Sequence, residues 1–259
     1  MEDLLDLDFS SQNNGIIVGT NGLLIRTTNG GTSWNSPSSR TARNIRSVDL
    51  FEGNTGIAVG DSGLIIKTSD GGITWNLRST TTTKHLNAVT FLNSNTVYAV
   101  GNNLTILKST DAGDSWSIVQ SSPSGGDFRS VFFYDENYGW ISSINGLIYT
   151  TIDGGITWIQ RSTILTSISG QAVNNVSFSD PLHGIAACTG GIIIRSTDGG
   201  VTWDTQPKLP LNVGVIDGVG VDGKRSFVFI GLPLHVLNGD VANAKSFLEK
   251  IVLDEFGLQ

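Results

Sequence analysis

The sequence predicts an all-β fold of the β-propeller class. One eight-residue phrase occurs five times, and its closing tryptophans lie 41, 41, 42 and 45 residues apart. Each interval holds short alternating apolar segments separated by Gly, Asn, Asp and Ser, which is typical of strands joined by tight turns. A period of roughly 40 to 50 residues with four strands per period favours propeller blades over a sandwich or a simple barrel.

The repeated phrase is an Asp-box, with the pattern Ser/Thr-x-Asp-x-Gly-x-Ser/Thr-Trp, and only the first copy has Asn in the Asp place. Asp and Gly favour a hairpin turn, since Gly adopts positive φ and the carboxylate accepts nearby backbone N–H groups. The tryptophan adds a large ring to bury. We therefore interpret the box as a structural turn in every blade. The predicted structural residues are Asn29, Trp34, Asp70, Trp75, Asp111, Trp116, Asp153, Trp158, Asp198 and Trp203.

Three longer strands are expected before each box, and a short fourth strand after it. The predicted first strands are 4–9, 45–51, 86–91, 128–133 and 173–178. The predicted second strands are 15–18, 56–59, 97–100, 139–142 and 184–187. The predicted third strands are 23–26, 64–67, 105–108, 147–150 and 192–195.

The last part of the chain departs from the repeat. Segments 213–221, 226–231 and 234–237 resemble three strands of a sixth blade, but no tryptophan closes it. Residues 241–256 have apolar residues at helical spacing and predict a short amphipathic helix, which would cover an exposed edge or dock on a partner. We favour six blades, with five blades plus an extension as the alternative. The expected organisation is a propeller over 1–240 and a C-terminal helix and tail over 241–259.

Composition excludes several classes of partner. The net charge is −7, which disfavours binding to nucleic acid or to an anionic membrane surface. No segment is apolar enough for direct membrane insertion, and the first residues do not resemble a signal peptide. We therefore expect cytoplasmic synthesis. The single cysteine, Cys188, lies in an apolar strand and is expected to be buried.

No catalytic, cofactor or metal site is predicted. The three histidines lie in different repeats without the spacing of metal ligands. Sialidases share the Asp-box, but neither their arginine entry motif nor a Tyr-Glu pair is visible. We predict a protein that is not an enzyme, and a glycan ligand is possible but unsupported.

Two groups of polar residues are candidates for partner binding. Arg46, Asn87, Arg129 and Asn174 occupy one repeat position near the start of successive first strands, which line the central channel of propellers. Arg40, Arg43 and Arg46 form a local basic loop in an otherwise acidic chain. A further basic series, including Arg26, Lys67 and Lys108, is a candidate for stacking on the box tryptophans.

Residues 56–75, which read GIAVGDSGLIIKTSDGGITW, carry a family resemblance. They resemble the repeat of the Ycf48/HCF136-like propellers, within the wider class of bacterial-neuraminidase-repeat proteins. That resemblance extends over roughly residues 7–237 and implies a non-enzymatic function. Its photosynthetic members help to assemble photosystem II on the lumenal side of thylakoids, and related domains occur in secreted bacterial proteins and phage particles.

These observations predict a structural or protein-docking component of a larger assembly, with a phage or virus particle as one setting. The alternative is a Ycf48-like factor for the assembly and stability of photosystem II. With a leader preceding this chain, that factor would act in the thylakoid lumen or the periplasm. A carbohydrate-binding or sialidase-like propeller is the second alternative.

Overall fold

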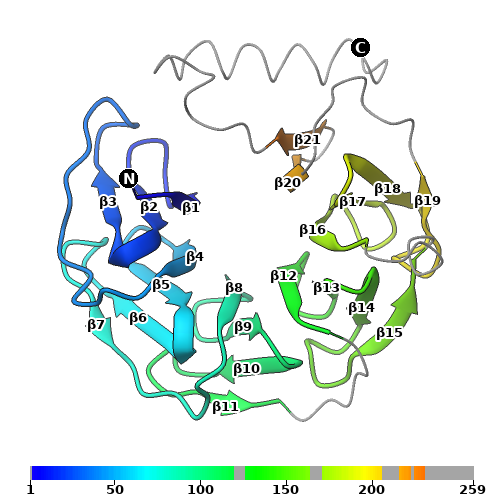
Figure 1. The fold of residues 1–259 in the computed structure, drawn as a ribbon, viewed down its shortest axis with the longest axis horizontal. Helices are drawn as coiled ribbons and strands as arrows, with labels where there is room; N and C mark the ends of the chain where they lie inside the picture. The colour runs from blue at the N-terminus through cyan, green and yellow to red at the C-terminus, as the bar shows by residue number, and fades with distance from the viewer. Residues whose placement is uncertain (1, 120–125, 164–170, 206–215, 223–224, 231–259) are drawn as a thin grey trace. The chain divides into compact units, whose positions relative to one another are not determined.

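The structure is a computed structural model that describes residues 2–119, 126–163, 171–205, 216–222 and 225–230. The described residues form β-strands joined by turns, with two short 3-10 segments (Figure 1). The chain divides into two compact units, which we call unit 1 (Met1–Gly139 and Thr151–Trp158) and unit 2 (Trp140–Thr150 and Ile159–Gln259). The predicted strand 234–237 and the predicted helix 241–256 lie outside the described residues.

Consecutive strands pair into five antiparallel sheets, which we call blades 1 to 5. Blade 1 has three strands, and each of the others has four. Blade 1 contains β1 (Leu4–Phe9), β2 (Gly15–Gly19) and β3 (Leu24–Thr27). Blade 2 contains β4 (Ile45–Phe51), β5 (Thr55–Gly60), β6 (Leu64–Thr68) and β7 (Asn76–Leu77). Blade 3 contains β8 (Leu86–Phe91), β9 (Val97–Gly101), β10 (Thr105–Ser109) and β11 (Ser117–Ile118).

The later blades follow the same order along the chain. Blade 4 contains β12 (Phe128–Phe133), β13 (Gly139–Ser143), β14 (Leu147–Thr151) and β15 (Ile159–Ser162). Blade 5 contains β16 (Val173–Phe178), β17 (Gly184–Cys188), β18 (Ile192–Ser196) and β19 (Asp204–Thr205). A further two-stranded sheet contains β20 (Ile216–Asp222) and β21 (Arg225–Ile230).

The sheet of β20 and β21 repeats a detail of the complete blades. In blade 2 the register shifts by one residue between Ile45 and Ser47, a β-bulge near the start of the first strand. The same shift occurs in β20, between Ile216 and Gly218. These two strands therefore begin a sheet of the same kind, with bounds that differ by up to three residues from the predicted 213–221 and 226–231.

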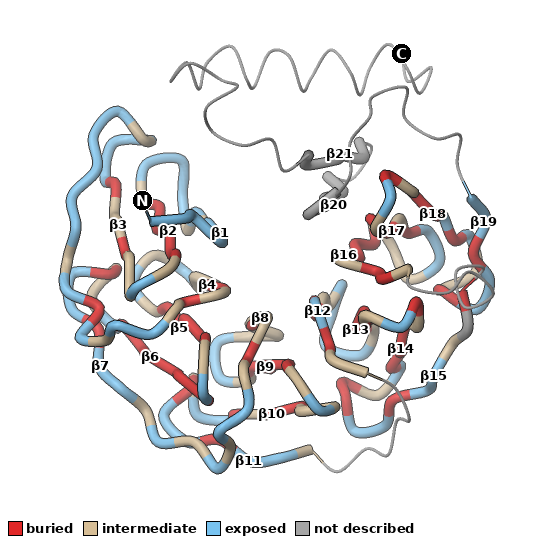
Figure 2. Tube along the Cα trace, viewed as in Figure 1, coloured by how far each residue is buried: buried red, intermediate tan, exposed pale blue. Residues whose placement is uncertain are grey.

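Neighbouring blades meet through apolar side chains, and we call each such contact a seam. In unit 1, residues of β2 and β3 pack against blade 2, in a cluster that includes Ile16, Leu24, Val48 and Trp75. Figure 2 shows the buried residues along these strands. The burial follows from the alternation of apolar residues, because successive side chains of a strand point to opposite faces.

Carboxylates join the first strands of blades 1, 2 and 3. Asp6 Oδ2 accepts the N–H of Val48 at 2.9 Å, and Asp8 Oδ2 accepts the N–H of Leu50 at 2.7 Å. One seam further on, Asp49 Oδ2 accepts the N–H of Phe91 at 2.6 Å. Side-chain acceptors thus satisfy backbone N–H groups that have no strand beside them, which buried polar groups require.

Each box turn is fixed in two ways. Its polar side chains bond within the turn: Asp111 Oδ1 accepts from the Ser109 hydroxyl at 2.7 Å and from the Ser115 N–H at 2.8 Å. The turn also bonds to the loop between the first two strands of its own blade, as in the bond from Ala112 N–H to Asn95 O at 2.7 Å. All five boxes make the corresponding backbone bond, so each turn is tied to its own blade.

Candidate protein-docking face

Antiparallel strands give each blade two ends with different chemistry. One end, which we call the box face, carries the Asp-box turns and the loops between first and second strands. The opposite end, which we call the linker face, carries the starts of the first strands and the turns between second and third strands. Backbone bonds tie the linker face together, such as those from Asp61 N–H to Asn44 O and from Asn102 N–H to His85 O.

In unit 1 the linker face carries basic side chains on two successive linkers. Arg43 lies in the linker to blade 2, and Lys84 lies 41 residues later, in the linker to blade 3. Both are exposed, as is Arg129 near the start of β12. No ion pair involves these three residues within the described part of the chain. They are therefore available to an acidic partner.

Asp61 contacts three side chains of the linker face. Its Oδ1 lies 2.5 Å from Arg46 Nε and 2.9 Å from His85 Nδ1, and its Oδ2 accepts from Asn44 Nδ2 at 2.9 Å. Both the arginine and the imidazole stay partly exposed, at 36% and 43% of the side-chain area. Arg46 is thus held in place by a carboxylate while part of its guanidinium remains accessible.

The other predicted residues of the repeated position have structural partners. Asn87 Nδ2 donates to Asn102 Oδ1 at 2.8 Å and to the backbone oxygen of Phe128 at 2.7 Å. Asn174 is also engaged in an interaction within the structure. Of the four residues at this position, the exposed Arg129 and the half-exposed Arg46 therefore present cationic groups to solvent.

The structure separates Arg40 from the other two arginines of its loop. Arg40 Nη1 donates to Asn76 Oδ1 at 3.2 Å, at the start of the outermost strand β7. Arg46 lies on β4, at the opposite edge of the same four-stranded sheet. Three strand spacings of about 4.8 Å separate these edges. The sequence places these arginines within seven positions, but the sheet directs them to the outer rim and the inner strand.

Sequence reasoning missed Lys84, His85 and Asp61 as members of this face. The signal was present, because adding the 41-residue period to Arg43 and Asn44 leads to Lys84 and His85. Asp61 lies in the turn after β5, and the repeat alone does not show that this turn lies beside Arg46.

The basic residues near the box face of unit 1 are engaged. Lys67 Nζ lies 2.9 Å from Asp114 Oδ2, and Arg78 Nε lies 3.0 Å from Asp114 Oδ1. The bond from Lys67, helped by Arg78, lowers the pKa of Asp114. Lys108 lies over the ring of Tyr98, 5.1 Å from its centroid. The predicted stacking of this basic series on box tryptophans is therefore wrong for Lys67 and Lys108, which have other partners.

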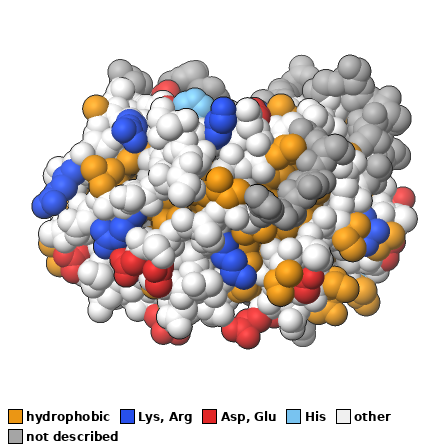
Figure 3. Space-filling view, turned by 90° about the horizontal axis from the view of Figure 1, so that it is seen from below, with side chains coloured by type: hydrophobic (Ala, Val, Ile, Leu, Met, Phe, Trp, Pro, Cys, Tyr) orange, Lys and Arg blue, Asp and Glu red, His pale blue; other side chains and the backbone are white. Residues whose placement is uncertain are grey.

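The box face is acidic instead. Among the box carboxylates, Asp111 is exposed and the other three are half-buried. Bonds led by the Ser115 hydroxyl lower the pKa of Asp111 to about 2. In Figure 3, most of the visible Asp and Glu side chains lie toward the lower edge, and Lys or Arg side chains lie beside a His near the upper edge. The linkers to blades 2 and 3 thus present exposed cations, and the box turns present carboxylates, which helps to orient an approaching charged partner.

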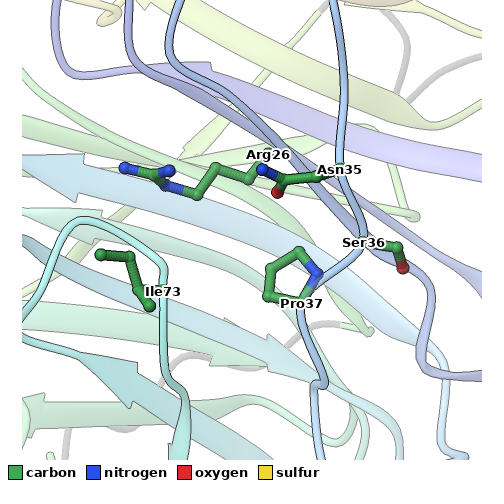
Figure 4. Close-up of a pocket in the computed structure, with 5 residues that line it drawn as sticks. All are labelled: Arg26, Asn35, Ser36, Pro37 and Ile73. Carbon is green, nitrogen blue, oxygen red and sulfur yellow. The ribbon is translucent and has the colours of Figure 1, made fainter.

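A shallow pocket of about 280 Å³ lies at the outer rim of blades 1 and 2 (Figure 4). It is lined by Arg26, Asn35, Ser36, Pro37 and Ile73. The arginine is held in place, because its Nε donates to the backbone oxygen of Gly71 at 2.6 Å. The lining contains no carboxylate, thiol or imidazole, so it offers no general acid, base or metal ligand.

Neither a metal-ligating cluster nor a membrane-spanning helix occurs among the described residues. No group of three His, Cys, Asp or Glu side chains there is arranged to hold a metal ion. None of the described helical segments has the length and hydropathy to cross a membrane.

Comparisons with known proteins agree with this fold. The family model described as "Photosynthesis system II assembly factor YCF48" matches residues 37–127 and 124–225. The structure of "YCF48 bound to D1 peptide" is similar with a TM-score of 0.57 and 19% identity, covering 88% of this chain and 90% of that one. YCF48 from Cyanidioschyzon merolae gives a TM-score of 0.53 and 19% identity, covering 88% and 92%. No match was found among curated proteins.

Glycoside hydrolases are also similar in fold. An ancestral GH74 enzyme gives a TM-score of 0.74 at 16% identity, covering 87% of this chain but 34% of the enzyme. At this identity the likeness concerns the fold alone, and a shared fold does not imply a shared activity. The predicted propeller class is confirmed by these neighbours and by the sheet topology.

Proposed function

This chain belongs to the family of the assembly factor YCF48, and on that premise we propose that it is a non-catalytic assembly factor that docks a segment of a client protein. The observation that supports this most directly is the set of exposed cations on the linker face of unit 1. Arg43, Lys84 and Arg129 are exposed there and have no ion pair among the described residues. Such a face favours an acidic client segment and steers it toward one side of the protein.

Docking of a peptide is also consistent with what is known of one relative. A YCF48 structure is described as bound to a D1 peptide, so a protein of this family binds a peptide. We propose the same mode here, with a membrane-complex subunit as the client, as in photosystem II assembly. The virion setting expected from composition has no support among the comparisons.

Charge reversal on the linker face tests the proposal. The variant Arg43→Glu/Lys84→Glu should recover at least tenfold less client than the original chain in native co-purification followed by quantitative mass spectrometry. Both side chains are exposed and have no ion partner among the described residues, so the fold should not depend on them.

The matched control is Arg195→Glu, which reverses an exposed charge on β18 of blade 5. Its client recovery should equal that of the original chain. Equal recovery by the double variant would contradict docking on the linker face, and absence of any stoichiometric client would contradict the assembly role itself.

Hydrolysis of a polysaccharide is the rival function, because GH74 enzymes share the fold. Glycosidases need two carboxylates about 5 to 10 Å apart that are free to act as acid and as base or nucleophile. The paired carboxylates of Asp8 and Asp49 instead bond to each other and to backbone N–H groups of the adjacent strands. Release of reducing sugar from xyloglucan by the purified chain would contradict the non-catalytic proposal.

A further inference from the structure

The pocket at the outer rim of blades 1 and 2 lies where the next seam holds a cluster of ions. Three residues of its lining have counterparts 41 residues later along the chain: Arg26 corresponds to Lys67, Pro37 to Arg78 and Ile73 to Asp114. In the seam between blades 2 and 3, Asp114 lies 2.9 Å from Lys67 Nζ and 3.0 Å from Arg78 Nε. One carboxylate therefore joins two cations at this position.

The seam between blades 1 and 2 keeps a cation at this position but has no carboxylate beside it. Ile73, which takes the place of Asp114, is apolar and 59% exposed. The carboxylate of the same box, Asp70, accepts its hydrogen bonds within its own turn. It makes no ion pair with Arg26. The arginine is therefore left without the partner that its counterpart has.

The Arg26 guanidinium is fixed at one side and open at its end. Its Nε donates to the Gly71 oxygen at 2.6 Å, which sets the direction of the group. Neither Nη1 nor Nη2 has an acceptor within the part of the chain that the structure describes. Figure 4 shows Pro37 and Ile73 on the same side of the extended arginine side chain. Two parallel N–H donors above an apolar floor suit a carboxylate on an aliphatic stem.

The third cation of this series in unit 1 has a partner of another kind. One box further on, the corresponding residues are Lys108 and Ile156, so the box again lacks the carboxylate. Lys108 instead lies over the Tyr98 ring, 5.1 Å from its centroid. No described aromatic ring lies in this way under Arg26. Among the described residues of this series in unit 1, Arg26 is thus the cation with donors to spare.

We propose that this pocket binds the carboxylate of a glutamate side chain, presented by an exposed segment of the client protein. The carboxylate would accept from Nη1 and Nη2 of Arg26, and its two methylene groups would pack on Pro37 and Ile73. Asn35 is exposed, and its side chain bonds to no described residue, so its amide is available to the backbone of the segment. This inference rests on the proposed docking function and adds a contact at the outer rim.

The form of the pocket favours a protein side chain over a free small molecule. Its volume is about 280 Å³, and Asn35, Ser36 and Ile73 in its lining are exposed. Sites for small ligands are typically larger, about 300 to 1,000 Å³, and enclose most of the ligand surface. A shallow site gains little from one carboxylate alone. The remainder of the bound segment must therefore contribute contacts around it.

The capped tripeptide acetyl-Ala-Glu-Ala-amide is the probe for this site, because the glutamate is its only charged group. Added to the ¹⁵N-labelled full chain, it should shift the NMR signals of Arg26 Nε–H and of the Ile73 amide, and the shifts should saturate at millimolar concentrations. The same peptide with glutamine should bind at least tenfold more weakly, since it cannot form the charged pair. Absence of saturable shifts at Arg26, or equal binding of the glutamine peptide, would overturn the proposal.

The variant Ile73→Asp tests the site with Arg26 still in place. It supplies the carboxylate that Asp114 provides in the next box, so it should occupy the guanidinium and weaken peptide binding at least tenfold. The matched control Ile73→Asn removes the same apolar side chain without adding charge, and should weaken binding no more than about threefold. Since Ile73 is exposed, both variants should fold, which circular dichroism checks. Equal binding by the two variants would contradict a carboxylate site.

Further measurements identify the source of the carboxylate. Butyrate carries the carboxylate and the aliphatic stem without peptide groups, and should bind more weakly than the tripeptide. Equal or tighter binding of butyrate would assign the pocket to free carboxylates and overturn the client segment. Shifts at Arg26 that follow protein concentration in the absence of peptide would assign it to a second copy of this chain, and would also overturn the proposal.

Client recovery separates this proposal from the proposed function. In native co-purification, Ile73→Asp should recover at least threefold less client than Ile73→Asn. If Arg43→Glu/Lys84→Glu loses the client while Ile73→Asp retains it fully, the docking function stands and the pocket has no part in it. If the original chain recovers no client, the docking function fails, and the peptide titration alone decides whether the pocket binds glutamate.

Discussion

The first and second Asp-boxes have the same turn and different surroundings. In the first box Asn29 Oδ1 accepts the N–H of Ser33 at 2.9 Å. In the second box Asp70 Oδ1 accepts the N–H of Thr74 at 2.9 Å. One box uses the neutral Asn29 and the other uses the carboxylate of Asp70. Yet Trp34 is 36% exposed, while Trp75 lies fully buried in the seam between blades 1 and 2.

This difference separates local from tertiary causes. The turn depends on residues within eight positions of one another, so an amide can replace a carboxylate without changing the backbone. The burial of the tryptophan depends on the second and third strands of the preceding blade. Similar sequence phrases are therefore expected to contribute different amounts to stability, according to what packs against them.

The largest expected effect comes from replacing the two tryptophans. Trp75→Ala should lower the free energy of unfolding by about 3 to 5 kcal/mol, since it leaves a cavity in a closed core. Trp34→Ala should cost only about 1 kcal/mol, because much of its ring already faces solvent. Urea unfolding followed by circular dichroism measures both. Equal losses would show that Trp34 is covered in solution and would contradict the difference in burial between the two tryptophans.

An intermediate effect is expected from pH, through the carboxylates of the first strands. Burial raises the pKa of Asp49 to about 7, with the Asp8 charge adding to the shift, and burial raises that of Asp6 to about 6. The folded chain thus retains protons that the unfolded chain has lost above about pH 4. Stability should therefore fall as the pH rises toward 7.

Thermal unfolding midpoints between pH 5 and pH 8 test this expectation. The original chain should lose stability across the range, and Asp49→Asn should flatten the dependence, since an amide has no proton to lose. Asp111→Asn is the matched control, because a box carboxylate with a pKa of about 2 does not titrate in this window. An unchanged slope in Asp49→Asn would contradict the shared burial of these carboxylates.

The smallest effect is expected within the boxes themselves. Asp111→Asn should cost less than about 1 kcal/mol at pH 7, because the turn is exposed and an amide keeps most of the bonds. Asn29→Asp should be neutral or slightly stabilising at pH 7 and should lose that gain below pH 4, where a carboxylate becomes protonated. Acid unfolding curves of both variants provide the measurement. A large loss in either would mean that box charge, not box geometry, holds the turn.

Much of the fold could be predicted from the repeat. The first strands of blades 1 to 5 have the predicted bounds, and their second and third strands agree to within one residue at each end. The alternation of apolar residues and the positions of the boxes are local signals, so they predict the strands without knowledge of the partner strands. The fourth strand of blade 1 was less predictable. Pro37 lacks the N–H that Arg78 donates to Ile65 O in blade 2, and the Ser36 hydroxyl bonds to Leu24 O instead.

The candidate site was predictable only in part. Arg43 and Arg46 were selected from sequence, but their neighbours Lys84 and Asp61 come from another linker and another turn. Distances along the chain do not reveal which side of a sheet an arginine reaches, as the outward placement of Arg40 shows.

The sequence by itself determined the propeller class, the box turns and the order of the strands, because these follow from period, alternation and turn chemistry. Only the tertiary structure decided which box tryptophan is buried, which arginine stays unpaired and which carboxylates hold protons. Those properties depend on the neighbouring blade, since burial and charge pairing are set by groups that lie about 41 residues away along the chain.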